Sequence, residues 1–312
     1  MGAHRACGMV GLGLGLLAAA PPARVHTATR TRALDLVPAD RTVPSSPEVT
    51  IEVDGEWRVI AGNGLPGHSV GRFPNRGNPH AIEARSVRYR VPAAPERGAQ
   101  QTELGLGLFG VAVNGVPFDP GAAEWFQGIR GSAWRYEALG GAVPLGIDVH
   151  HAHVQPSGQY HYHGLPSGLL DELDDGTAHG ALVGWAADGF PIYALRGYAD
   201  PQDPAGGVAS VRSGWRLKKG ARPEGSDAPG GSYDGTFVAD YAYEGGEAVL
   251  DECNGRFGRT PEFPDGTYAY FLTADFPVIP RCFVGSASPD FTRRPPPPRG
   301  APRGKRPPPR PR

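Results

Sequence analysis

Turn-forming residues interrupt this chain so often that only short strands fit between them. Of the 312 residues, 46 are Gly and 34 are Pro, and the segments between them are rich in Val, Ile, Tyr and Phe, which favour strands. Some segments contain the Asp-Gly or Asn-Gly pair that is typical of tight hairpins. The pattern predicts an all-β protein, a mainly antiparallel sandwich or barrel-like domain with long loops. The segments are TIEVDGEWRVIAGNG, RSVRYRVPAAP, LGLFGVAVNGVPFDP, ALVGWAADGFPIYAL, YDGTFVADYAYEGG and YAYFLTADFPVIPRCF.

Helical patterning is nearly absent from the chain. Only residues 167–173 (SGLLDEL) predict a helix, of about two turns, and Gly176 is placed to end it. No internal repeat and no flexible linker divides residues 51–291. We therefore expect a single β-rich domain there, preceded by a polar linker at 24–50.

The first 23 residues resemble a secretory signal peptide. Arg5 precedes a run of small and apolar residues at 6–20, and Pro21, Pro22 and Ala23 follow it. The run is shorter than the roughly 20 residues that a membrane span needs, and no later segment qualifies. We expect a secreted protein with no transmembrane segment in the mature chain, and an uncleaved anchor is the alternative.

Export would also decide the state of the cysteines. Cys7 lies in the segment to be removed, which leaves Cys253 and Cys282 as an even pair. In an oxidising compartment such a pair tends to form a disulfide bond. The alternative role for these cysteines is that of thiolate metal ligands.

Charge is distributed unevenly along the sequence. The Pro-rich segment 292–312 carries eight basic residues and no acidic one, and residues 24–291 have a net charge of about −10. An acidic body argues against nucleic acid as a partner, since phosphate binding needs a basic face. We expect the segment 292–312 to be a disordered, polyproline-like tail, either a solvated spacer or a contact to anionic surfaces.

Five of the ten histidines fall within residues 149–163, VHHAHVQPSGQYHYH. Pro156 and Gly158 fit the second and fourth positions of a type I turn, so QPSG is expected to join two strands. Side chains alternate across a strand, so His161 and His163 share a face. Several neutral imidazoles close together suit a zinc, copper, nickel or iron(II) ion. The alternative is a hydrogen-bond network of packed histidines.

The register of this hairpin remains open. A four-residue loop would place His150 on the face of His161 and His163. A slip by one residue, or a bulge, would instead place His151 and His153 on that face. Either arrangement would bring three or four imidazoles together.

Further polar residues are candidates for the same site. His179 follows the expected helix. The loop that carries it could fold back to the hairpin, so that His179 becomes a metal ligand. Asp188, in AADGFPIYAL, is either a hairpin turn residue or a carboxylate that ligates a metal or orients an imidazole. Asp148 could orient an imidazole in the same way. Tyr160 and Tyr162 are expected to be packed aromatic residues.

Besides the sequence Tyr-His-Tyr-His-Gly at 160–164, the chain contains the segments AHV, FGVAVNGV, GWAADGFPIY, YDGT, DY, LDECNG, GTYAYF and FPVIPRCF. They resemble the YHYH domain family of exported bacterial and algal proteins. The resemblance covers residues 78–285 and leaves out the segments 24–50 and 292–312. It implies that the site residues are His153, His161, His163, His179 and Asp188. His150 and His151 fall outside its pattern.

Three functions fit these residues, and we favour the first. It is a metal-binding protein of the cell exterior that stores, buffers or passes on copper or zinc, since no obvious nucleophile stands beside the histidines. The second is a metal-dependent enzyme, either a hydrolase that uses metal-bound hydroxide or a copper oxidase that uses a nearby tyrosine, because three histidines with an open fourth position are typical of catalytic zinc sites. The third is a structural or carbohydrate-binding β domain whose histidines form a hydrogen-bond network.

Overall fold

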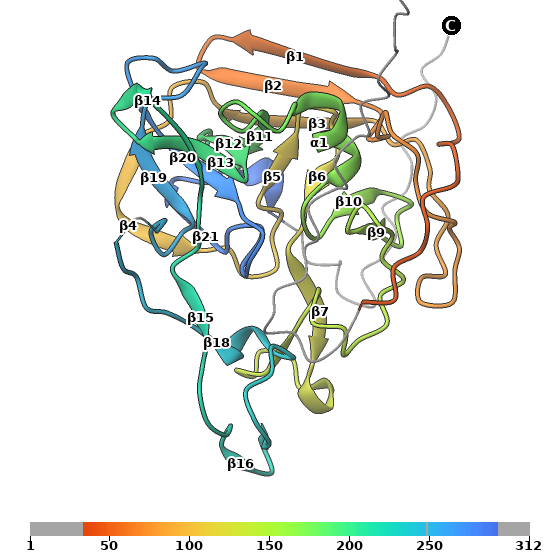
Figure 1. Ribbon diagram of the computed structural model, residues 1–312. Coiled ribbons are helices and arrows are strands. Elements are labelled where there is room, and N and C mark those ends of the chain that lie inside the picture. Colours follow the sequence, from red (N-terminus) through yellow and green to blue (C-terminus); the bar gives the residue numbers. More distant parts are fainter. Residues whose placement is uncertain (1–33, 248, 293–312) are drawn as a thin grey trace, which may run out of the picture.

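The computed structural model describes residues 34–247 and 249–292 (Figure 1). The expected signal peptide, Cys7 and the basic tail after Thr292 lie outside the described residues. Among the helices of the described part, none is long and apolar enough to cross a membrane.

A mixed eight-stranded sheet forms the centre of the fold. Its neighbouring strands run antiparallel except for two parallel pairs, β12 with β20 and β6 with β10. The prediction of an all-β protein with mainly antiparallel sheets and long loops is confirmed. From one edge to the other, the strands are β19 (Gly255–Gly258), β20 (Thr267–Leu272), β12 (Pro191–Ala194), β11 (Leu182–Ala186), β5 (Gly110–Ala112), β6 (Pro117–Phe118), β10 (Tyr160–Tyr162) and β9 (Ala152–Val154).

Smaller sheets and ribbons surround this sheet. One three-stranded sheet lies across one end of the molecule, and the ribbon that contains β16 lies at the opposite end (Figure 1). The three-stranded sheet is β1 (Val49–Asp54), β2 (Trp57–Gly62) and β3 (Val87–Pro92). The two-stranded ribbons pair β4 (Arg97–Glu103) with β21 (Cys282–Gly285), β7 (Gly121–Trp125) with β8 (Arg135–Glu137), β13 (Arg196–Asp200) with β14 (Asp203–Ser210), β15 (Trp215–Leu217) with β18 (Tyr241–Tyr243), and β16 (Glu224–Gly225) with β17 (Ala228–Pro229).

Helical structure is short throughout the described residues. The α-helix α1 (Ser167–Leu173) has the bounds expected from the sequence and buries Leu169 and Leu170. Gly168 of this helix packs on the ring of His68, and a Cβ atom there would lie 2.4 Å from that ring. Three 3-10 turns complete the helical elements: η1 (Phe126–Gly128), η2 (Val238–Asp240) and η3 (Pro289–Phe291).

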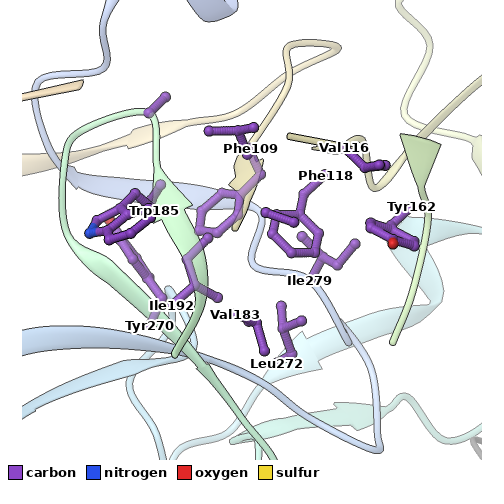
Figure 2. Packing of buried hydrophobic residues seen from close by; sticks show 14 of the residues in the cluster. Phe109, Val116, Phe118, Tyr162, Val183, Trp185, Ile192, Tyr270, Leu272 and Ile279 are labelled. Carbon is purple, nitrogen blue, oxygen red and sulfur yellow. The ribbon is translucent and has the colours of Figure 1, made fainter. Parts of the chain in front are cut away.

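The hydrophobic core packs against the middle strands of the central sheet. β11, β12 and β20 are buried along almost their whole length, as expected of strands that are covered on both faces. Phe109 stacks on Phe283 with ring centroids 5.3 Å apart and meets the edge of Tyr270 at 5.0 Å. Phe118 and Ile279 lie beside them in the same core (Figure 2). This core fixes β6, and through it β10, in the sheet.

The predicted disulfide bond is confirmed between Cys253 and Cys282. Cys253 precedes β19 at one edge of the central sheet, and Cys282 begins β21. The bond therefore ties that edge to the β4–β21 ribbon.

The segment expected to be a linker is ordered where the structure describes it. Leu34, Leu36 and Val43 pack against the core. The backbone of Val37 donates to Ile147 and accepts from Val149 at 2.9 and 3.0 Å. Residues 34–48 therefore belong to the folded unit, because their few apolar side chains and their backbone both find partners. They also support the loop that leads into the histidine hairpin.

Candidate metal centre

The histidines lie on a hairpin formed by β9 and β10. His161 pairs directly with His153, which is the slipped register of the two that the sequence allows. Gly158 causes the slip because it adopts a left-handed φ of 84° and gives a three-residue loop closed by the bond from Gln155 N–H to Gln159 O (2.9 Å). The four-residue loop that would have placed His150 on the face of His161 and His163 is not formed.

Three imidazoles meet on one face of this hairpin. The Nε2 atom of His163 lies 3.0 Å from Nε2 of His161 and 3.0 Å from Nε2 of His153. His161 and His163 are buried, and His153 is half-buried. We call these three residues the histidine triad.

Hydrogen bonds of the outer nitrogens indicate the tautomers of His153 and His161. Nδ1 of His153 lies 2.8 Å from Leu145 O, and Nδ1 of His161 lies 3.2 Å from Gln159 O. A carbonyl oxygen only accepts, so each Nδ1 carries the proton and each Nε2 keeps a lone pair. Metal-bound histidines are held in this way in proteins, with the second nitrogen donating to a carbonyl or carboxylate.

The donor set and its spacing fit a transition metal ion. Zinc binds imidazole nitrogen at about 2.0–2.1 Å, which places tetrahedral nitrogen ligands about 3.3 Å apart. The two separations of 3.0 Å that His163 makes need small side-chain movements to reach that geometry. The triad could therefore hold a metal ion.

The surroundings of His153 favour a neutral ring. Burial, reinforced by the neighbouring His161, lowers the pKa of His153 to about 3, against smaller opposing effects of the hydrogen bond to Leu145 and of Asp119. A neutral imidazole is the form that coordinates a metal. His153 is thus ready to ligate at any ordinary pH.

A cavity of about 360 Å³ adjoins the triad. Its walls include Asp119, Glu124 and His80. Asp119 is buried, and its Oδ2 lies 4.0 Å from Nε2 of His161.

Sequence reasoning missed Asp119. This residue follows β6, and its N–H donates to Tyr162 O at 2.8 Å. It reaches the triad because β6 pairs in parallel with β10, about 40 residues later. A parallel pairing of such short strands leaves no pattern in the sequence that would have pointed to it.

His150 and His151 lie outside the triad. His151 has a left-handed backbone (φ 54°), and its Nδ1 lies 2.9 Å from Leu165 O. Nδ1 of His150 lies 2.9 Å from Ser167 Oγ, and its ring packs against His68 with centroids 4.4 Å apart. The backbone turn at His151 therefore explains why the slipped register brings only His153 to the pair.

The opposite face of the hairpin carries the two tyrosines, which are packed and fully buried. Tyr162 Oη lies 2.8 Å from His68 Nε2, and the amide of Asn114 donates to the same oxygen at 3.0 Å. Tyr160 donates to Asp148 Oδ2 at 2.7 Å. These bonds fix the two tyrosines, and so the direction in which the alternating histidines point.

Asp148 organises the loop that enters β9. Its carboxylate accepts from the backbone N–H of Gly71, His150 and Ala152 at 2.9, 3.0 and 3.2 Å. Burial raises the pKa of this carboxyl group, and the hydrogen bonds oppose the rise. None of these bonds goes to an imidazole, so Asp148 positions the hairpin through its backbone.

His179 and Asp188 lie away from the triad. His179 sits between Tyr193 and Tyr198 with ring centroids 4.9 and 4.8 Å apart. Asp188 lies in the turn between β11 and β12 and accepts from Tyr270 Oη (2.6 Å) and Gly285 N–H (2.9 Å). Both residues flank β11, which is three strands, or roughly 14 Å, from β10. The structure therefore brings together three of the five residues expected at the site.

Comparison with known proteins gives one match. The family model described as YHYH protein matches residues 88–285. This range includes the hairpin, Asp119 and the two cysteines. No curated protein and no solved structure matches the chain.

Proposed function

The chain belongs to the YHYH protein family, and from its site we propose that it binds one transition metal ion, copper or zinc, through the histidine triad. The observation that carries this proposal is the convergence of three imidazoles: Nε2 of His163 lies 3.0 Å from Nε2 of both other histidines, and the possible ligand atoms all lie within 4.8 Å of one another. For His153 and His161, the protons on Nδ1 leave these nitrogens as acceptors. A metal ion bound among the three rings would use the Nε2 lone pairs of His153 and His161 directly.

Copper(II) is expected to bind more tightly than zinc. Nitrogen-ligand sites follow the Irving–Williams order unless geometry intervenes. The site offers three imidazoles and no thiolate, because the two described cysteines form a disulfide bond. His179 and Asp188 have no part in this proposal, since both flank β11.

We also propose that the protein acts outside the cytoplasm. A disulfide bond is common in secreted proteins and rare in reducing compartments, and Cys253 and Cys282 form one. The apolar run near the N-terminus of the sequence supports the same location. A metal-binding role in storage, buffering or transfer fits an exported protein.

A metal-dependent enzyme is the second candidate, and one observation favours it. The triad lines a cavity of about 360 Å³, so a fourth ligand could reach the ion from that side. Three protein ligands with one open position are the usual construction of a catalytic zinc site.

Metal analysis tests the proposal directly. For this experiment, the protein is expressed so that the host cell exports it. It is then purified without chelator and without nickel resin. It is then analysed as isolated and after incubation with Cu(II) or Zn(II) followed by desalting. We expect one equivalent of metal per chain. A protein that retains no metal under any of these conditions would instead have a hydrogen-bond network at the triad.

A further inference from the structure

Two carboxylates lie in the wall of the cavity beside the triad. Asp119 and Glu124 contribute carboxylates, and no Lys or Arg occurs among the described residues that form its walls. Oε2 of Glu124 is buried and has no hydrogen-bond partner in the described part of the chain. A carboxylate can only accept while it is ionised. A molecule that pairs with these carboxylates must therefore supply the hydrogens.

Asp119 is held rigidly at the edge of this cavity. It is 1% exposed. Its Oδ2 accepts from Gln155 Nε2 at 3.0 Å, and its backbone N–H is bound to Tyr162 O. A buried side chain anchored from both sides presents its carboxylate in one orientation.

The distance between Asp119 and the triad indicates an indirect role. Its Oδ2 lies 4.0 Å from His161 Nε2, whereas two ligands of one tetrahedral zinc ion lie about 3.3 Å apart. Since Asp119 and the triad line the same cavity, a group bound to the ion on the cavity side would be close to Asp119. A hydroxyl or amino group there could donate to the carboxylate at an ordinary hydrogen-bond length.

We infer that the fourth coordination position opens into this cavity and takes a small protic ligand without negative charge, namely water, an alcohol or an amine. Asp119 accepts a hydrogen from that ligand, and Asp119 and Glu124 together repel anions. This inference rests on the proposed function. It adds the chemical class of the fourth ligand. It also assigns Asp119 as the residue that determines which ligand the site accepts.

The test compares an anionic and a protic probe on the copper-loaded protein. Azide and methylamine are titrated into parent protein and into Asp119→Asn, and binding is followed by the visible absorption and electron paramagnetic resonance of Cu(II). We expect Asp119→Asn to retain copper with an affinity within about threefold of the parent. Its preference for azide over methylamine should rise by at least about tenfold, because the repulsion is removed while the shape is kept.

Two further variants keep the result interpretable. Glu124→Gln removes the second carboxylate and should shift the preference in the same direction by a smaller factor. Glu83→Gln is the matched control, since Glu83 is exposed near the hairpin loop and does not line the cavity, and it should leave the preference unchanged. If Asp119→Asn does not fold, Glu124→Gln carries the test alone.

The possible failures are distinguishable. A parent protein that takes up no copper overturns the proposed function and this inference with it. Copper binding with the same azide preference in parent, Asp119→Asn and Glu124→Gln overturns only the inference. A folded Asp119→Asn that loses copper affinity by more than about tenfold also overturns it, because Asp119 would then be a direct ligand.

Discussion

His153 and His161 lie directly opposite each other on neighbouring antiparallel strands, with ring centroids 4.6 Å apart. Residues that face each other across such a pair are the closest contacts that a sheet offers. His163, two residues further on the same face, then lies within reach of both. The whole triad therefore depends on the register of one hairpin, which the loop at 155–159 sets.

Replacing Gly158 by Ala tests the control of this register. Gly158 has a left-handed φ of 84°, and a Cβ atom there would lie 2.8 Å from Cβ of Glu83. A left-handed backbone costs a non-Gly residue about 1–2 kcal/mol, and the contact adds to this cost. We expect Gly158→Ala to lower the free energy of unfolding by about 2 kcal/mol or more and to weaken metal binding, as measured by denaturant titration and calorimetry.

Gly220→Ala is the matched control for that change. Gly220 also has a left-handed φ, of 93°, but a Cβ atom there would meet no other atom within 4 Å. It should lose about 1 kcal/mol and keep full metal affinity. Equal losses of stability in the two variants would show that Glu83 does not restrict the loop.

Variants of Asp148 and Tyr160 measure how much the carboxylate of Asp148 stabilises the hairpin. Asp148→Ala leaves three backbone N–H groups and the hydroxyl of Tyr160 without their shared acceptor, and each unpaired buried group costs about 1–3 kcal/mol. We expect a loss of about 3 kcal/mol or more in the free energy of unfolding. Tyr160→Phe removes one of these bonds and should cost about 1 kcal/mol. Similar losses in denaturant titrations of the two variants would contradict a central role for Asp148.

The sequence predicted local features well. The helix at 167–173 was identified from its own pattern, since α1 depends on neighbouring residues and on the glycine that follows. The strands on both sides of QPSG were found in the same way. The register remained open because Pro156 and Gly158 fit both a four-residue loop and the three-residue loop that forms, and only the conformation of Gly158 distinguishes them.

Features that depend on distant pairing were not accessible from the sequence. His179 and Asp188 lie near the hairpin in sequence, but β5 and β6 insert between β11 and β10. Asp119 lies far away in sequence and reaches the triad through the parallel pair of β6 and β10. Strand order is decided by the packing of the whole core, and two-residue strands such as β6 carry almost no information about their neighbours.

The low pKa of His153 predicts acid sensitivity of the metal-free protein. Because burial lowers this pKa from about 6.5 to about 3, the unfolded chain binds the proton more readily than the folded one. The stability that the neutral ring contributes is present above about pH 6.5 and is lost as the pH falls towards 3. Between about pH 7.5 and pH 5.5, this loss is about 1 kcal/mol.

His153→Gln isolates that contribution, since glutamine does not titrate. Unfolding free energies of metal-free parent and variant are measured across this pH range. We expect their difference to shrink on acidification by about 1 kcal/mol. Curves that stay parallel would show that His153 keeps an ordinary pKa in the folded protein.

Calorimetric titration of Cu(II) into the parent and into His153→Ala, His161→Ala and His163→Ala tests the central claim most directly. His150→Ala is the control, because its ring packs on His68 and bonds to Ser167 away from the triad. We expect one site per chain, a loss of affinity of at least tenfold, or about 1.4 kcal/mol, in each triad variant, and no more than about a threefold change in the control. Triad variants that bind copper as tightly as the parent would contradict the assignment of the triad as a metal site.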